Sequence, residues 1–211
     1  MPSDDKNVRL YGPWAGRRPQ DAAALLEDYP GPWWIAGGWA IEAFTGVPRP
    51  HGDLDIGIPR TDVPLLLAHL QGRLHVWAAA GSLTPLTTAA ATVANGCGNL
   101  WLRASGADPW EYDVLLEHVE GSTWTYKRDP RIRRPLDEAL WRRDGLVYLR
   151  PEVQLLLKAV HTREKDNRDL ASCLPVMDQT SKRWLAETLS RAHPEHPWLR
   201  RLPAPRREDL R

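Results

Sequence analysis

The sequence of 211 residues lacks several features that would place it in a specialised class of protein. It has only two cysteines, Cys97 and Cys173, which follow no metal-binding spacing and form no dense disulfide framework. They suit reduced thiols in a cytosolic protein, although two cysteines can in principle pair. No apolar run approaches the roughly 18 residues that span a bilayer, and the polar start MPSDDKNVRL predicts no signal peptide. We therefore expect a cytoplasmic protein with no membrane partner.

The net charge is also small, and phenylalanine is rare. A net charge of +1 gives no general attraction to anionic partners, so we expect no tight binding of nucleic acid. One phenylalanine stands beside 11 tryptophans. The tryptophans supply much of the aromatic core, or some of them line a cleft for a ring-bearing ligand. Hydrophobic residues make up 42%, enough for one buried core with or without a smaller extension, and monomer and dimer stay equally open.

The pattern of apolar residues changes near residue 150. Before it, short strand-like segments alternate with short helices, and from Pro151, a favoured first residue of a helix, the pattern is helical. We therefore predict an α/β catalytic domain over residues 1–150 and a helical domain over residues 151–211. Predicted helices cover residues 20–29, 39–44, 61–72, 151–175 and 181–193, and predicted strands cover residues 33–36, 53–58, 73–79, 99–104, 111–118, 122–128 and 146–150.

The segment GGWAIEAFTGVPRPHGDLDI, residues 37–56, ends in two closely spaced acids. Side chains alternate across a strand, so Asp53 and Asp55 share one face, while Leu54 and the isoleucines that follow share the core face. Two carboxylates held this close repel each other unless a cation lies between them. Mg²⁺ is typically bound by one or two carboxylates and substrate phosphates. Two solvated acids on an edge strand would give the same local pattern.

The same segment begins with Gly37 and Gly38. A strand, a glycine turn and a helix start would place backbone N–H groups at a helix N-terminus, where anions bind. Glycine also lets a phosphate come close to the backbone. A Gly-Gly pair alone usually marks only a turn. Phosphate donors and an acidic pair within one strand–helix–strand unit, however, predict a site for a magnesium-bound nucleoside triphosphate.

A third acid is expected if two metal ions are used. The predicted strand over residues 111–118 offers Asp113, which lies in mid-strand between apolar neighbours, where an unpaired carboxylate is costly. Glu111 and Glu117 lie nearer the strand ends and are the alternatives. We therefore predict that Asp113 joins the acidic pair.

These residues resemble the nucleotidyltransferase superfamily of the DNA polymerase beta type. The string of residues 37–56 is similar to that of the aminoglycoside-2''-adenylyltransferase-like and lincosamide nucleotidyltransferase branch, and so are RRDGLVYLRPEVQLLLKA and KDNRDL further along. The resemblance implies a mixed sheet with flanking helices, followed by a helical domain that closes the active-site cleft. It also implies that Asp53, Asp55 and Asp113 are the catalytic residues and bind two Mg²⁺ ions, with ATP or another nucleoside triphosphate as co-substrate. Asp113 either binds one of the metal ions or acts as general base on the acceptor hydroxyl.

The resemblance extends to the nucleotide-binding residues. Many superfamily members have serine after the first glycines, whereas this chain has Trp39, which we interpret as local packing. The backbone of Gly37, Gly38 and Trp39 is then left to contact phosphates. Lys158 is implied as a further phosphate contact, with an exposed helix lysine as the alternative. Arg49 and His51 either touch phosphates or fix the loop before the acids.

We expect transfer of a nucleoside monophosphate, with AMP from ATP as the first choice, to a hydroxyl of a small molecule such as an aminoglycoside or a lincosamide. One competing interpretation is a nucleotidyltransferase that modifies a protein or RNA within a toxin–antitoxin pair. The other is a nucleotide-binding protein without catalysis, against which the complete set of three acids argues.

Overall fold

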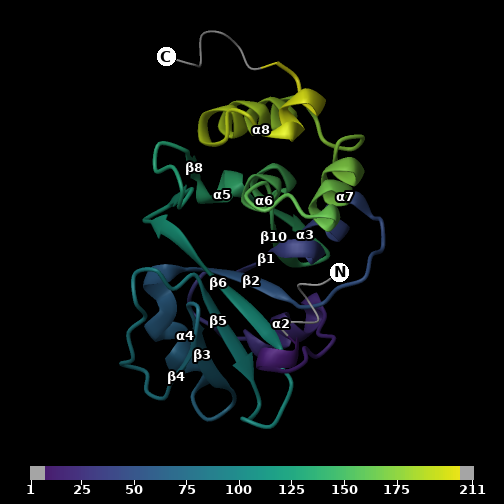
Figure 1. Ribbon diagram of the computed structural model, residues 1–211. Coiled ribbons are helices and arrows are strands. Elements are labelled where there is room, and N and C mark those ends of the chain that lie inside the picture. The colour runs from purple at the N-terminus through teal and green to yellow at the C-terminus, as the bar shows by residue number, and fades with distance from the viewer. Residues whose placement is uncertain (1–7, 205–211) are drawn as a thin grey trace.

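The computed structural model describes residues 8–204 (Figure 1). The first seven residues, on which the signal-peptide prediction partly rests, and residues 205–211, at the end of the predicted helical domain, lie outside the described residues. Between residues 8 and 204 no helix is both long and apolar enough to cross a membrane.

A mixed β-sheet forms the centre of the molecule. Its strands follow the order β4-β3-β5-β6-β2-β1-β10-β9, and two short strands, β7 and β8, extend from β6. The pairs β2–β6 and β1–β10 are parallel, and the other pairs are antiparallel. The strands are β1 (Trp34–Ile35), β2 (Asp55–Pro59), β3 (His75–Ala79), β4 (Leu83–Leu86), β5 (Asn99–Arg103), β6 (Tyr112–Glu120), β7 (Thr123–Thr125), β8 (Arg133–Pro135), β9 (Leu140–Arg143) and β10 (Leu146–Leu149).

Helices flank this sheet, so the predicted fold class, a mixed sheet with flanking helices, is confirmed. The long helix predicted over residues 151–175 is wrong, because two helices with a break at residues 159–163 replace it. Thr162 has a φ of 43° in this break, a value that a β-branched residue rarely adopts within a helix. The helices are α2 (Pro19–Leu25), α3 (Gly37–Thr45), η1 (Arg60–Asp62), α4 (Val63–Leu70), α5 (Leu136–Ala139), α6 (Pro151–Lys158), α7 (Glu164–Cys173), α8 (Gln179–Ala192) and η2 (Pro197–Arg201).

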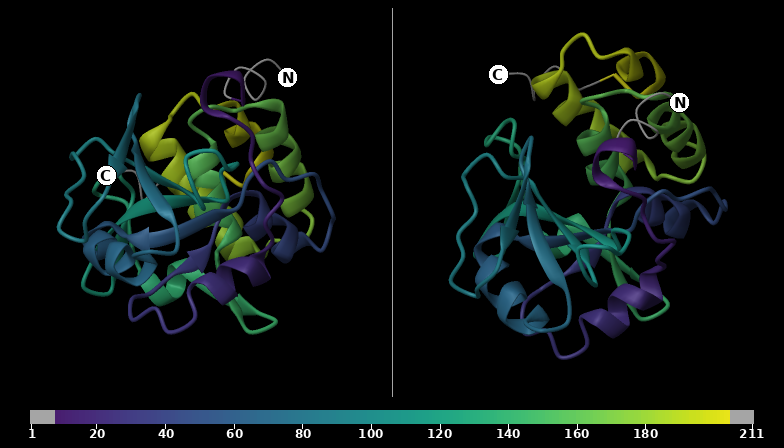
Figure 2. Two further views of the ribbon diagram at one scale, coloured as in Figure 1. Left: turned by 90° about the horizontal axis from the view of Figure 1, so that it is seen from below. Right: turned by 60° about the horizontal axis from the view of Figure 1, so that its bottom comes forward.

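Two hydrophobic clusters hold the elements together. The first packs α2 and α4 against the sheet and includes Leu54 and Ile56, which confirms the predicted core face of β2. The second joins the C-terminal helices to residues that precede them in the chain, among them Trp34, Ile41 and Trp124. Figure 1 and the right-hand view of Figure 2 show α6, α7 and α8 gathered at the end of the molecule opposite α4, β3 and β4. The shared core therefore fixes α6 and α7 beside α3.

The start of α3 differs from the expectation. The helix begins at Gly37 rather than at residue 39, so both glycines are its first two residues instead of a separate turn. The strands β4, β8 and β9 were not predicted from the sequence. Each contains only three or four residues, which is too short for a clear alternation of apolar and polar positions.

Candidate active site

The three acids predicted from the sequence lie together. Strands β2 and β6 are parallel neighbours in which Asp55 pairs with Asp113, and Asp53 lies two residues before β2. One oxygen from each carboxylate lies within 4.8 Å of the others. Within residues 8–204 no other group of three or more His, Cys, Asp or Glu side chains is gathered this closely. The pairing of β2 with β6 thus brings residues about 60 positions apart into one acidic cluster.

This cluster carries like charges that are incompletely neutralised. Burial and the charge of Asp53 raise the pKa of Asp55 to about 7, while Lys158 acts in the opposite direction. Burial and the charge of Asp55 also raise the pKa of Asp113 well above its ordinary value, against a hydrogen bond from Asn99 Nδ2 to Asp113 Oδ1 of 2.8 Å. A convergent set of carboxylate oxygens with this electrostatic cost fits a hard divalent cation such as Mg²⁺.

Gly37 is needed for the close approach of Asp55. Its φ is +63°, and a Cβ atom at this position would lie only 1.6 Å from Asp55 Oδ2. Its N–H donates a hydrogen bond of 2.6 Å to Gln154 Oε1 on α6, so this group is not available to a phosphate. The expectation that the Gly37 N–H binds phosphate is therefore corrected. Gln154, 117 residues away, was not predicted, because no local pattern links it to the glycine pair.

The N–H groups of Gly38 and Trp39 remain candidates for phosphate binding. Both belong to the first turn of α3, and neither bonds to another group within residues 8–204. The Trp39 ring stacks on the His51 ring with 3.7 Å between centroids and 6° between planes. This packing agrees with the interpretation of the tryptophan as a local packing residue, and it leaves the backbone to meet an anion.

Arg49 and His51 fix the loop that leads to the acids. Arg49 Nη1 donates to Asp169 Oδ1 on α7 at 2.6 Å, and His51 Nε2 lies 2.8 Å from Glu42 Oε2 on α3. A Cβ atom added to Gly38 would lie 3.1 Å from both side chains. The contacts therefore match the loop-fixing alternative, and they also hold both side chains against the start of α3.

Lys158 is close to the acids but already paired. Its Nζ lies 3.0 Å from Asp169 Oδ2 and 3.6 Å from Asp166 Oδ1, and its side chain is only 9% exposed. Burial alone would raise the pKa of Asp166, but a hydrogen bond from Arg163 and the charge of Lys158 lower it below its ordinary value. The structure thus places Lys158 among acids of α7, with its charge still acting on Asp55. The exposed-lysine alternative is wrong.

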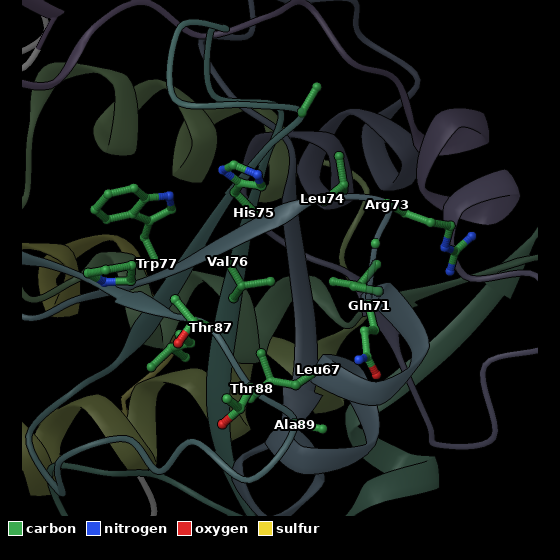
Figure 3. A pocket seen from close by; sticks show the side chains of 15 residues that line it. Leu67, Gln71, Arg73, Leu74, His75, Val76, Trp77, Thr87, Thr88 and Ala89 are labelled. Carbon is green, nitrogen blue, oxygen red and sulfur yellow. The ribbon is translucent and has the colours of Figure 1, made fainter.

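A cavity of about 340 Å³ lies elsewhere, between α4 and the β3–β4 edge of the sheet (Figure 3). None of the three aspartates lines it. Its walls come from Leu67, Leu70, Gln71, Gly72, Arg73, Leu74, His75, Val76, Trp77, Pro85, Leu86, Thr87, Thr88, Ala89 and Ala104. The acidic cluster is therefore separate from this cavity.

Residues 20–87 match the model of a protein family described as aminoglycoside-2''-adenylyltransferase. The predicted resemblance is confirmed. The matched segment contains the start of α3 together with Asp53 and Asp55, whereas Asp113 and Lys158 lie beyond it. The family match, together with the shared fold of the similar structures, also confirms the predicted class of enzyme, a nucleotidyltransferase. A search of curated proteins finds no match to the sequence.

Solved structures similar to the chain share its fold at low sequence identity. A crystal structure of the lincosamide antibiotic adenylyltransferase LnuA bound to lincomycin has a TM-score of 0.51 and 15% identity, covering 75% of this chain and 95% of that one. A crystal structure of ANT(2'')-Ia with adenylyl-2''-tobramycin has a TM-score of 0.53 and 17% identity, covering 82% and 95%. A solution structure of ANT(2'')-Ia has a TM-score of 0.52 and 17% identity, covering 89% and 94%.

Proposed function

We propose that the protein is a magnesium-dependent adenylyltransferase that transfers AMP from ATP to a hydroxyl of a small molecule such as a lincosamide or an aminoglycoside. The observation that carries this proposal is the convergence of Asp53, Asp55 and Asp113 beside the first turn of α3. The similar structures are bound to lincomycin and to adenylyl-2''-tobramycin, which supports an antibiotic as acceptor.

We assign a role to each acid according to its position. Asp53 and Asp55 would hold Mg²⁺, which when bound would neutralise carboxylate charge and the negative charge of the nucleotide phosphates. The N–H groups of Gly38 and Trp39 would hold the phosphates at the positive end of α3. Three cationic side chains lie close enough to act electrostatically on Asp55, and their positive charge favours binding of the triphosphate. They are Lys158, Lys165 and Arg163.

Asp113 would receive the proton of the acceptor hydroxyl. The acceptor oxygen attacks the α-phosphorus, a new O–P bond forms, the bond from the α-phosphorus to the bridging oxygen breaks, and pyrophosphate leaves. The hydroxyl proton passes to a carboxylate oxygen of Asp113, which must lie within hydrogen-bond reach.

The experiment incubates the protein with labelled ATP, GTP, CTP or UTP, Mg²⁺ and a panel that includes lincomycin and tobramycin. Mass spectrometry then detects gain of a nucleoside monophosphate on the acceptor. We expect a gain of AMP that disappears with EDTA and in Asp55→Asn. A suitable control is Asp178→Asn, because Asp178 caps α8 through Ser181 N–H and asparagine caps helices equally well.

Two results would contradict the proposal. One is label on added RNA or protein but on no small molecule, which would favour the macromolecular alternative. The other is binding of Mg·ATP without any transfer to the panel, combined with equal behaviour of Asp55→Asn and Asp178→Asn.

A further inference from the structure

The strand pairing places two tryptophans in line with the acids. Asp55 pairs with Asp113, Asp113 with Trp101, and Trp101 with Trp77, each on the next strand of the sheet. Directly paired residues point to the same face, and neighbouring strands lie about 4.8 Å apart. Trp101 is therefore one strand and Trp77 two strands beyond the third acid. We call Trp77, Trp101 and the neighbouring Arg103 the tryptophan row.

The two ends of this line differ in charge. The side of Asp55 faces the first turn of α3, where Asp55 lies against Gly37 and the Arg49 side chain lies against Gly38. The opposite side, beyond Asp113, is aromatic: the Trp101 ring contacts the rings of Tyr11, Trp14 and Trp110. A nucleoside triphosphate is a polyanion and belongs on the cationic side. The acceptor hydroxyl must then reach Asp113 from the side of the tryptophan row.

The tryptophan row carries hydrogen-bond donors without partners. The indole N–H groups of Trp77 and Trp101 and the Nε–H of Arg103 are buried and bond to no other described group. Buried donors are almost always satisfied in native proteins. Three such donors next to the acids indicate a ligand that brings hydrogen-bond acceptors.

The tryptophan row also lacks free negative charge. The other acids on this face of β6 are engaged, because Glu111 accepts a 2.9 Å hydrogen bond from Arg17 Nε and Glu117 accepts one from Trp124 Nε1. The Arg103 guanidinium carbon lies 4.9 Å from the Trp77 ring and 4.1 Å from the Trp110 ring. The cavity that shares Trp77 has no acidic residue in its walls. Apart from the acidic cluster that is proposed to hold Mg²⁺, a polycation would find no free carboxylate here, whereas an anionic group would meet Arg103.

We propose that the tryptophan row is the acceptor subsite and that it selects a hydroxylated ring compound without net positive charge. This inference rests on the proposed function and narrows its acceptor class away from polycationic aminoglycosides. Ring faces of the ligand pack against indole, as expected for an aromatic pocket wall. Acceptor oxygens of the ligand satisfy the indole and guanidinium donors.

The test uses 4-nitrophenyl glucuronide, 4-nitrophenyl glucoside and tobramycin as anionic, neutral and polycationic probes. Calorimetry measures the binding of each probe alone, and a second series measures the KM for the probe and for Mg·ATP. We expect the glucuronide to bind most tightly, the glucoside next and tobramycin most weakly. Trp77→Phe removes one donor and should weaken glucoside binding about fivefold, with the KM for Mg·ATP unchanged. Arg103→Gln should abolish the advantage of the glucuronide over the glucoside.

The matched control is Trp184→Phe. Trp184 lies on α8 under Arg134, whose guanidinium carbon is 4.9 Å from the ring, so it repeats the cation–π geometry of Trp77 away from the acids. It should leave all probe affinities unchanged. Tighter binding of tobramycin than of the glucoside, failure of both glycosides to bind, or an unaltered glucuronide preference in Arg103→Gln would overturn the inference. Because probe binding needs no nucleotide, these results are distinct from failure of the proposed adenylyl transfer.

Discussion

Replacement of Gly37 by alanine tests whether the first residue of α3 exists to admit the Asp55 carboxylate. The added Cβ atom would lie 1.6 Å from Asp55 Oδ2, far inside the contact distance of roughly 3.5 Å. The carboxylate must therefore move by more than about 1 Å, and a displacement of this size at a reacting centre can cost on the order of 10² in rate. The φ of +63° adds a strain of about 1–2 kcal/mol for a residue with a Cβ.

Gly46→Ala separates the two effects. Gly46 ends the same helix with a φ of +69°, and a Cβ atom there would meet nothing within 4 Å. Both variants should lose about 1–2 kcal/mol of unfolding free energy through backbone strain. Only Gly37→Ala should also lose Mg²⁺ binding and catalysis, because only there does the new methyl group displace an acid of the cluster.

Urea unfolding measures the strain, and Mg²⁺-dependent thermal shift and pyrophosphate release measure the site. We expect Gly46→Ala to keep the Mg²⁺ response and most of the turnover, whereas Gly37→Ala keeps neither. The reasoning fails if Gly37→Ala turns over like the unmodified protein. It fails equally if Gly46→Ala loses as much activity as Gly37→Ala, since backbone strain would then explain both.

Three further predictions concern the charges of the site. Asp53→Asn should weaken Mg·ATP binding measured by calorimetry, whereas Asp113→Asn should keep binding and lower turnover by about 10² to 10⁴; equal loss of binding would make Asp113 chiefly a metal ligand. Because the pKa of Asp55 is raised from 3.8 to about 7, the metal-free protein should lose stability as pH rises through that interval. Added Mg²⁺ should accordingly raise Tm more at pH 8 than at pH 6, and a shift independent of pH would count against the site. Lys158→Met removes one cation from Asp166 and Asp169, which keep Arg163 and Arg49 as partners, and should cost about 1.5–3 kcal/mol in urea unfolding; a cost below about 0.5 kcal/mol would mean that the pairing is marginal.

The acidic cluster could be predicted from the sequence because each acid lies in a segment with a strong local pattern. Alternation in β2 separated Asp53 and Asp55 from the core residues Leu54 and Ile56, which the structure buries. Alternation in β6 placed Asp113 on the same face as Glu111 and Glu117, but it could not choose among the three. The parallel register of β2 and β6 makes that choice geometrically, since it pairs Asp113 with Asp55.

The hydrogen-bond partners of the site residues could not be predicted from such local patterns. Gln154 meets the Gly37 N–H, Asp169 meets Arg49, and Asn99 meets Asp113, each across a tertiary contact. No periodicity or spacing encodes such a contact, because it depends on how helices and strands pack. The single helix predicted over residues 151–175 failed for a related reason. Its break at Thr162 turns α7 back so that Asp166 and Asp169 reach Lys158.

Contacts from α6 and α7 explain why the acids of the sheet depend on the C-terminal helices. Gln154 holds the Gly37 N–H and so orients the residue against which Asp55 lies. Asp169 links Lys158 to Arg49, which belongs to the loop that delivers Asp53 and Asp55. The second hydrophobic cluster fixes these helices beside α3 by apolar burial, a force without direction, and the hydrogen bonds then set the orientation. Displacing α6 and α7 from α3 would therefore disturb the geometry of the acidic cluster without changing any of the three acids.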